Sequence, residues 1–210
     1  MKLKNLFFAV TLVLAFTQMS FAQTIVGSAH DFSSQAWNTT GEICIVCHTP
    51  HGAITTVSNA PLWNHQVTAT AAFTLYSGST FNGASTITQP DASSKLCLSC
   101  HDGTVALQNF SGTTGAGTTI SSFYNVGTNL ANDHPISFDY NAALVAADGG
   151  GLKDPTTALG IGTQTIQNSM LFSNKMQCAS CHDVHNSAGI AFLLLKSNAA
   201  SALCLTCHNK

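Results

Sequence analysis

CIVCHTPH, residues 44–51, is the stretch of this 210-residue chain that decides its fold. Two cysteines stand three positions apart, a histidine follows at once, and a second histidine comes three residues later. The C-x-x-C-H part recurs three times, and the four copies contain all eight cysteines of the chain. In chain order the copies are Cys44, Cys47 and His48; Cys97, Cys100 and His101; Cys178, Cys181 and His182; and Cys204, Cys207 and His208.

C-x-x-C-H is the attachment pattern for c-type haem. The two thiols add across the vinyl groups of one porphyrin, and two intervening residues let both sulfurs reach the same ring edge. The adjacent histidine then supplies the proximal ligand of the iron. The sequence therefore predicts four covalently attached haem c groups, held by the eight cysteines, with His48, His101, His182 and His208 as proximal ligands.

Other uses of paired cysteines were weighed against haem attachment. Zinc sites and redox dithiols share C-x-x-C, and disulfide loops are a further alternative. None of these explains why a histidine follows each of the four pairs, so haem attachment is the preferred interpretation.

The N-terminus has the pattern of a secretory signal peptide. Lys2 and Lys4 precede an apolar stretch at residues 6–16, and Ser20-Phe21-Ala22 is a small-x-small cleavage site. We expect residues 1–22 to be removed, and no later stretch predicts a membrane span. Export fits the motifs, because haem c is attached on the outer side of the bacterial inner membrane.

Charged residues are scarce, at 8% of the chain, and arginine is absent. No basic patch can be assembled, so nucleic acid is excluded as a partner. A surface of Ser, Thr, Asn and Gly repels its own copies only weakly, which permits self-association.

An internal repeat divides the chain. Each half contains one motif with an extra histidine (CHTPH, then CHDVH) and one preceded by leucine (LCLSCH, then LCLTCH). We predict a first haem pair at 23–110, a Gly/Ser/Thr-rich connecting region with His134 at 111–169, and a second haem pair at 170–210.

Regular structure is predicted to be sparse, with short α-helices at the haem motifs. One helix leads into the Cys97 motif, with Asp91 or Ser93 as N-cap and Gly103 as the stop; another leads into the Cys204 motif, with Ser197 or Asn198 as cap. Residues 111–122 and 148–157 predict loops.

Short extended pieces are expected at Phe123, Tyr124, Phe138 and Tyr140, and residues 191–196 fit a strand, a haem-contacting segment or core packing. The fold class is therefore a mostly irregular multihaem cytochrome c with a haem-packed core, in which neighbouring haems lie close together.

Each iron also needs a sixth ligand or an open site. Pro50 precedes His51 and Pro135 follows His134, so both imidazoles have restricted backbones. His51 and His185 share a helical face with their own proximal histidines and are expected to ligate a neighbouring haem. Met170 and Met176 are rival ligands, but core filling suits them better. The distal candidates are His30, His51, His65, His134 and His185.

The segments SAHDFS, CHTPHG, PLWNH, LCLSCHDGTVA, DHPISF and CHDVHN, in this order, resemble the doubled-CXXCH multihaem cytochromes, and more narrowly the OmcE-type tetrahaem nanowire cytochromes. The resemblance implies bis-histidine ligation, stacked haems, little secondary structure and a haem chain that continues between subunits. It also implies that one histidine ligates a haem of another copy. His30, near the mature N-terminus, is the first candidate, and His51 is the next.

These expectations favour an exported electron carrier over an enzyme. Its partners would be other copies of itself in an extracellular filament, together with a redox donor and a protein or extracellular acceptor. One alternative is a monomeric periplasmic shuttle; another is a reductase with an open haem site. The donor, the acceptor, the potentials and the order of the haems do not follow from the sequence.

Overall fold

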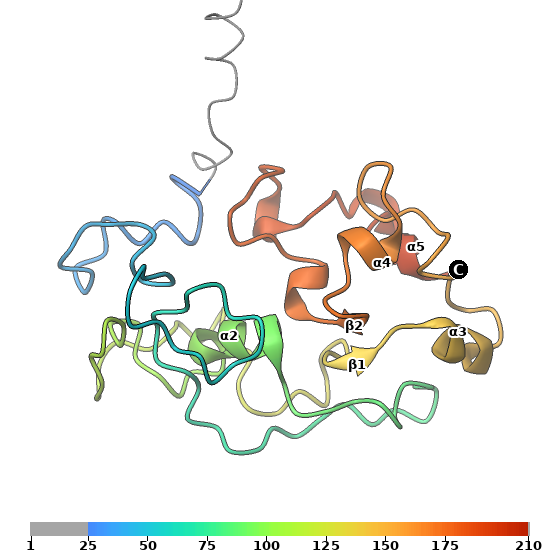
Figure 1. Ribbon diagram of the computed structural model, residues 1–210, viewed down its shortest axis with the longest axis horizontal. Helices are drawn as coiled ribbons and strands as arrows, with labels where there is room; N and C mark the ends of the chain where they lie inside the picture. The colour runs from blue at the N-terminus through green and yellow to red at the C-terminus, as the bar shows by residue number, and fades with distance from the viewer. Residues whose placement is uncertain (1–24, 210) are drawn as a thin grey trace, which may run out of the picture.

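The computed structural model describes residues 25–209, so the predicted signal peptide lies outside the described residues. Short helices and one two-stranded sheet stand out from a chain of turns and irregular segments (Figure 1). The elements are α2 (Ala92–His101), β1 (Phe138–Asp139), α3 (Ala142–Asp148), α4 (Ile166–Ser169), β2 (Lys175–Met176), the 3-10 turns η2 (Cys178–Ser180), η3 (Ala191–Leu193) and η4 (Ala199–Ser201), and α5 (Cys204–Cys207).

The prediction of a mostly irregular fold is confirmed. Across the described residues, twelve non-glycine residues have a positive φ, a conformation that neither a helix nor a strand continues. Two of them, Ala200 and Ser201, interrupt the approach to the last motif. No helix in residues 25–209 is long and apolar enough to cross a membrane.

The two halves of the chain are joined at the centre of the molecule. In Figure 1 the blue-to-green first half lies mainly on the left and the orange-to-red second half on the right, with the two-stranded sheet between them. β1 pairs with β2 in antiparallel register, Phe138 opposite Met176 and Asp139 opposite Lys175.

The largest apolar cluster lies beside this sheet. Its buried members are Phe138, Tyr140, Leu144, Ile166, Met170, Met176, Leu203 and Cys207. Two smaller clusters form around Trp63 and Leu96, and around Phe73 and Leu98. Met170 and Met176 therefore fill the core, as their apolar thioethers suit.

The predicted helix before the Cys97 motif is present as α2. Gly103 follows its end with a φ of 75°, a left-handed conformation that glycine adopts readily. Asp91 is the N-cap residue, but its side chain makes no capping hydrogen bond. Its carboxylate instead accepts hydrogen bonds from Lys175 and Gln177, both outside the helix.

The predicted single helix before the Cys204 motif is wrong. Ala200 (φ 50°) and Ser201 (φ 61°) split it into η4 and the four-residue α5. The capping residues still serve locally, because Ser197 Oγ accepts from the Ala199 N–H and Asn198 Oδ1 from the Leu203 N–H.

The prediction of extended segments is correct for Phe138 and Tyr140 and wrong for Phe123 and Tyr124. Phe138 lies in β1, and Tyr140 continues extended from it, with its N–H bonded to the Asn174 carbonyl at 2.8 Å. Phe123 and Tyr124 instead lie in a turn. Residues 191–196 begin as η3 and then run beside the third motif, where the Leu195 N–H bonds to the Cys181 carbonyl at 2.9 Å.

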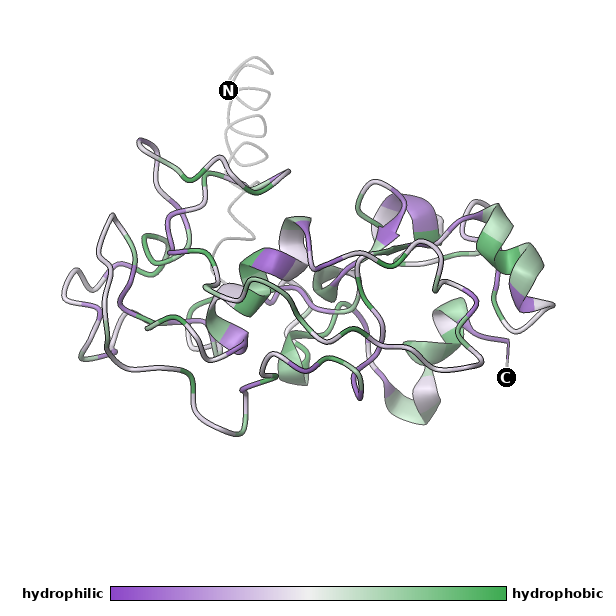
Figure 2. Cartoon of the chain, turned by 90° about the horizontal axis from the view of Figure 1, so that it is seen from below, coloured by the Kyte–Doolittle hydropathy of each residue, from purple (hydrophilic) through white to green (hydrophobic). Residues whose placement is uncertain are grey.

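Figure 2 shows how apolar and polar segments alternate along the length of the molecule, with the apolar α3 at one end. Asn141 is the N-cap of α3, and its side chain accepts a hydrogen bond from the Leu144 N–H. Gly149, with a φ of 69°, is the C-cap. Only Leu144 of this helix is buried, so α3 contributes little to the core.

Candidate functional site: four cysteine–histidine motifs

The four motifs share one local conformation. In each, the N–H of the histidine bonds to the carbonyl of the first cysteine, which makes one helical turn. The distances are 2.8 Å for His48, 3.1 Å for His182 and 3.0 Å for His208, and His101 makes the same turn inside α2. This turn brings both thiols and the imidazole to one side of the backbone, as attachment to one porphyrin requires.

A second segment returns along each motif and pairs with its histidine. His48 bridges to Trp63, His182 to Leu194 and His208 to Leu152, and the N–H of Val126 bonds to the His101 carbonyl at 2.7 Å. These backbone bonds hold the motifs without long helices or strands.

The returning segments also orient the imidazoles. His48 Nδ1 lies 2.6 Å from the Pro61 carbonyl, His101 Nδ1 2.9 Å from that of Tyr124, and His182 Nδ1 2.9 Å from that of Phe192. A carbonyl only accepts, so Nδ1 carries the proton and donates it. Nε2 is then the nitrogen that remains for iron, an arrangement typical of metal-bound histidine.

The thiols of successive motifs approach one another. All eight cysteines are free thiols. A hydrogen bond with Cys178 and burial raise the pKa of the Cys97 thiol. Burial, together with the nearby Cys47, raises the pKa of Cys100 to about 12.

The thiols of the third and fourth motifs also approach each other. Burial raises the pKa of Cys207 to about 11, with a further contribution from Cys181. The first motif thus neighbours the second, the second neighbours the third, and the third neighbours the fourth.

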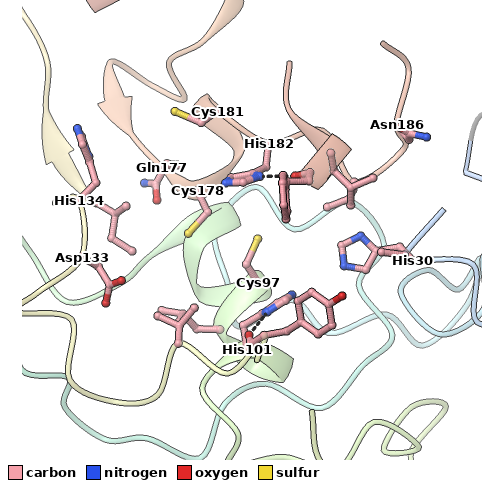
Figure 3. Close-up of a pocket in the computed structure, with 18 of the residues that line it drawn as sticks. His30, Cys97, His101, Asp133, His134, Gln177, Cys178, Cys181, His182 and Asn186 are labelled. Carbon is pink, nitrogen blue, oxygen red and sulfur yellow. Dashed lines mark hydrogen bonds between the residues drawn. The ribbon is translucent and has the colours of Figure 1, made fainter. Parts of the chain in front are cut away.

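A cavity of about 920 Å³ joins the second and third motifs. Its lining includes Cys97 and His101 from one motif and Cys178, Cys181 and His182 from the other (Figure 3). Figure 3 shows the sulfurs of Cys97 and Cys178 pointing into the same space, with His101 and His182 on either side. The remaining lining is largely apolar, with Leu98, Val126, Leu130, Ile136, Ile190 and Phe192 among its members.

This cavity fits haem in its chemistry. It offers apolar walls to a flat apolar ring, attachment thiols at its edge and imidazoles whose Nε2 is available. Because two motifs supply these groups, the cavity suits two adjoining haems better than one.

The lone histidines occupy different places. His30 and His134 line the large cavity. His65 is fully buried, with Nε2 3.6 Å from the Cys100 sulfur. His185 faces Asp183, whose carboxylate accepts the His185 N–H at 2.9 Å and so shapes the CHDVH turn. His51 is exposed beside a polar pocket of about 460 Å³. At the second and third motifs, the structure therefore brings remote imidazoles to the cavity.

A buried polar network sets the distance between the second and third motifs. Gln177, directly before Cys178, is 2% exposed; its Oε1 accepts from the hydroxyls of Ser94 and Ser137, and its Nε2 donates to Asp91 at 2.6 Å. The Ser94 hydroxyl oxygen also accepts the Cys178 N–H at 3.0 Å. The sequence did not predict this network, because Gln177 lies 40 positions from Ser137 and more than 80 from Ser94 and Asp91.

We expect Gln177→Leu to lower the free energy of unfolding of the haem-loaded protein by about 2–4 kcal/mol. The substitution keeps the volume but leaves two buried hydroxyls without their acceptor, and the Asp91 carboxylate keeps only Lys175 of its two side-chain donors. Urea denaturation followed by haem absorbance measures the effect. Gln167→Leu is the matched control: its side chain bonds only to the exposed Asn174, so a change within about 0.5 kcal/mol is expected there. Equal effects of the two substitutions would contradict the role given to the network.

A second polar network fixes the segment around His65. Asp102, buried directly after His101, accepts hydrogen bonds from Thr68, Thr70 and Thr104. The Ser99 hydroxyl accepts the Thr68 N–H at 3.0 Å. Asp102 was not identified from the sequence, although its position one residue after the motif histidine was visible.

Comparison with known protein families gives one match. Residues 172–210 match the family model described as the doubled CXXCH motif. The match covers the third and fourth motifs, a minor part of the chain. No curated protein matches the sequence.

These findings support a multihaem c-type cytochrome. The motif match supports this class, and the C-x-x-C-H copies indicate covalently bound haem c. The mostly irregular fold is consistent with a small haem-packed cytochrome. The doubled motif also indicates a function in electron transfer.

Proposed function

We propose that this chain is an exported tetrahaem cytochrome that carries electrons along a row of closely spaced haems with histidine on both faces. When bound, haem supplies an iron that exchanges one electron reversibly. The chain's part is to fix the spacing of its four motifs, to orient the imidazoles and to exclude water with apolar side chains.

The observation that carries this proposal is the shared cavity of the second and third motifs. The Cys97 and Cys178 thiols are in contact, so porphyrins attached to them would be next to each other. Proximity of Cys47 to Cys100, and of Cys181 to Cys207, extends the row in both directions. The row then follows the order of the motifs in the chain.

Bis-histidine ligation is supported by the number and place of the lone histidines. Two of them line the cavity, and His134 Nδ1 lies 2.9 Å from the Pro135 carbonyl, which leaves Nε2 free for iron as in the motif histidines. An iron with imidazole on both sides has no open position for a substrate, so we propose an electron carrier and not an enzyme.

Assembly into an extracellular filament is the finer part of the proposal. Phe123 is 78% exposed and Phe192 73% exposed, and both line the large cavity. Apolar side chains beside a redox site suit contact with another copy of the chain. The scarcity of charge supports the same conclusion. A donor and a terminal acceptor complete the set of partners.

We expect four haems per chain in the pyridine haemochrome assay and no carbon monoxide binding by the reduced protein. The assay reports attachment, and carbon monoxide reports any iron with an open face. A colourless protein would end the proposal. Binding of carbon monoxide at one haem per chain would instead favour a reductase. Electron micrographs that show only single particles would favour the monomeric shuttle.

A further inference from the structure

Three pairs of histidine rings have nearly the same separation. The ring centroids are 6.1 Å apart for His30 and His101, 6.2 Å for His48 and His185, and 6.5 Å for His134 and His208. Each pair joins one motif histidine to one lone histidine, and no histidine occurs twice. Ordinary aromatic contact allows such separations but does not explain this one-to-one pairing.

The separation is the one that a single metal ion between two imidazoles requires. A metal–nitrogen bond of about 2 Å on each side, together with about 1 Å from each nitrogen to its ring centre, puts the centroids about 6 Å apart. His48, His101 and His134 each use Nδ1 on a carbonyl, so Nε2 is the nitrogen that remains for a metal ion between the rings.

His30 shows a further sign of a missing partner. Its Nδ1 is buried and has no hydrogen-bond partner among residues 25–209. A buried nitrogen that is held opposite a motif histidine and lacks a partner is suited to bind metal.

The relative orientation of the rings separates the three pairs into two kinds. The ring planes of His48 and His185 are 14° apart, close to parallel. Those of His30 and His101 are 82° apart, and those of His134 and His208 are 75° apart, close to perpendicular. Ligand-plane angle controls the electronic anisotropy of low-spin ferric iron, so the two kinds differ in their magnetic spectra.

We propose that His185, His30 and His134 are the sixth ligands at the first, second and fourth motifs, with parallel imidazoles at the first and crossed imidazoles at the other two. This assignment rests on the proposed function and deepens it. It makes His30 a ligand within its own chain, in contrast to the intermolecular role expected from the sequence. His65 and His51 remain as candidates for the third motif.

The pairing also ties together distant parts of the chain. His185 follows the third motif by three residues but faces the proximal histidine of the first. The sequence expectation that His185 serves a neighbouring haem thus gains a specific target, His48. His134, in the connecting region, faces His208, the proximal histidine of the last motif.

Electron paramagnetic resonance of the oxidised, haem-loaded protein tests the assignment. Near-parallel imidazoles give a rhombic low-spin signal, and crossed imidazoles give a signal with one very large g value. His185→Ala is expected to remove the rhombic signal and to convert about a quarter of the iron to a high-spin form. His134→Ala and His30→Ala are each expected to diminish the large-g signal and to preserve the rhombic one.

Gln167→Leu, whose side chain bonds only to Asn174, serves as the control and should leave both signals intact. An undiminished rhombic signal in His185→Ala, or its loss in His134→Ala, would overturn the pairing. The pyridine haemochrome assay on the same samples separates the two levels of failure. Four haems with the wrong spectra would contradict only the pairing, whereas absence of haem would contradict the proposed function.

Discussion

A chain in which all eight cysteines are changed to serine is expected to remain unfolded. Most of the apolar residues buried within residues 25–209 fall into three separate clusters, two of which have only three buried members. The longest helix there, α2, has ten residues, which is below the length at which isolated helices are stable. Without porphyrins to add apolar surface, burial cannot offset the loss of conformational entropy.

Urea denaturation followed by circular dichroism checks this prediction. The eight-fold variant should show no cooperative transition, and the haem-loaded chain should show one. Cys204→Ser/Cys207→Ser, which removes a single motif at the end of the row, is the graded control and should retain a transition at lower urea. A cooperative transition in the eight-fold variant would show that protein contacts alone specify the fold.

Removal of the third motif is expected to stop electron exchange between the two halves of the molecule. Cys178→Ser/Cys181→Ser should lower the haem content by one and leave a gap between the second and fourth motifs. Cys204→Ser/Cys207→Ser also removes one haem, but it leaves three adjoining motifs. Exchange should therefore fall by orders of magnitude in the first variant and persist among three haems in the second.

Flash-induced electron transfer, with haem content measured on the same samples, distinguishes the two variants. If both lost exchange equally, the row would not follow the order of the motifs. If neither lost it, electrons would pass by a route that avoids the third motif. Either result would contradict the claim that electrons pass along the four haems in the order of their motifs in the chain.

The motifs and the sparse regular structure followed from the sequence because their chemistry is local. A C-x-x-C-H turn needs only its own residues, and Gly103 ends α2 because glycine tolerates a positive φ. The predicted helix before Cys204 failed at Ala200 and Ser201, since alanine and serine rarely adopt a positive φ and nothing nearby signalled the break.

The joint between the halves could not be predicted, because it depends on residues far apart in sequence. Gln177 meets Ser94 and Ser137 next to the point where β1 pairs with β2. The pairing of the imidazoles is of the same kind, since the spacing of histidines in the chain carries no information on which rings face each other. Haem-to-haem geometry is likewise a property of the folded chain.

The desolvated thiols imply an order of events in the making of this protein. Burial raises the pKa of Cys47 to about 11 and that of Cys100 to about 12, so neither sulfur is appreciably ionised near neutral pH. The protonated form reacts poorly, and an assembly enzyme would have to reach Cys207 through the apolar cluster that surrounds it. Haem attachment at Cys47, Cys100 and Cys207 is therefore expected while the polypeptide is still open, before the chain becomes compact.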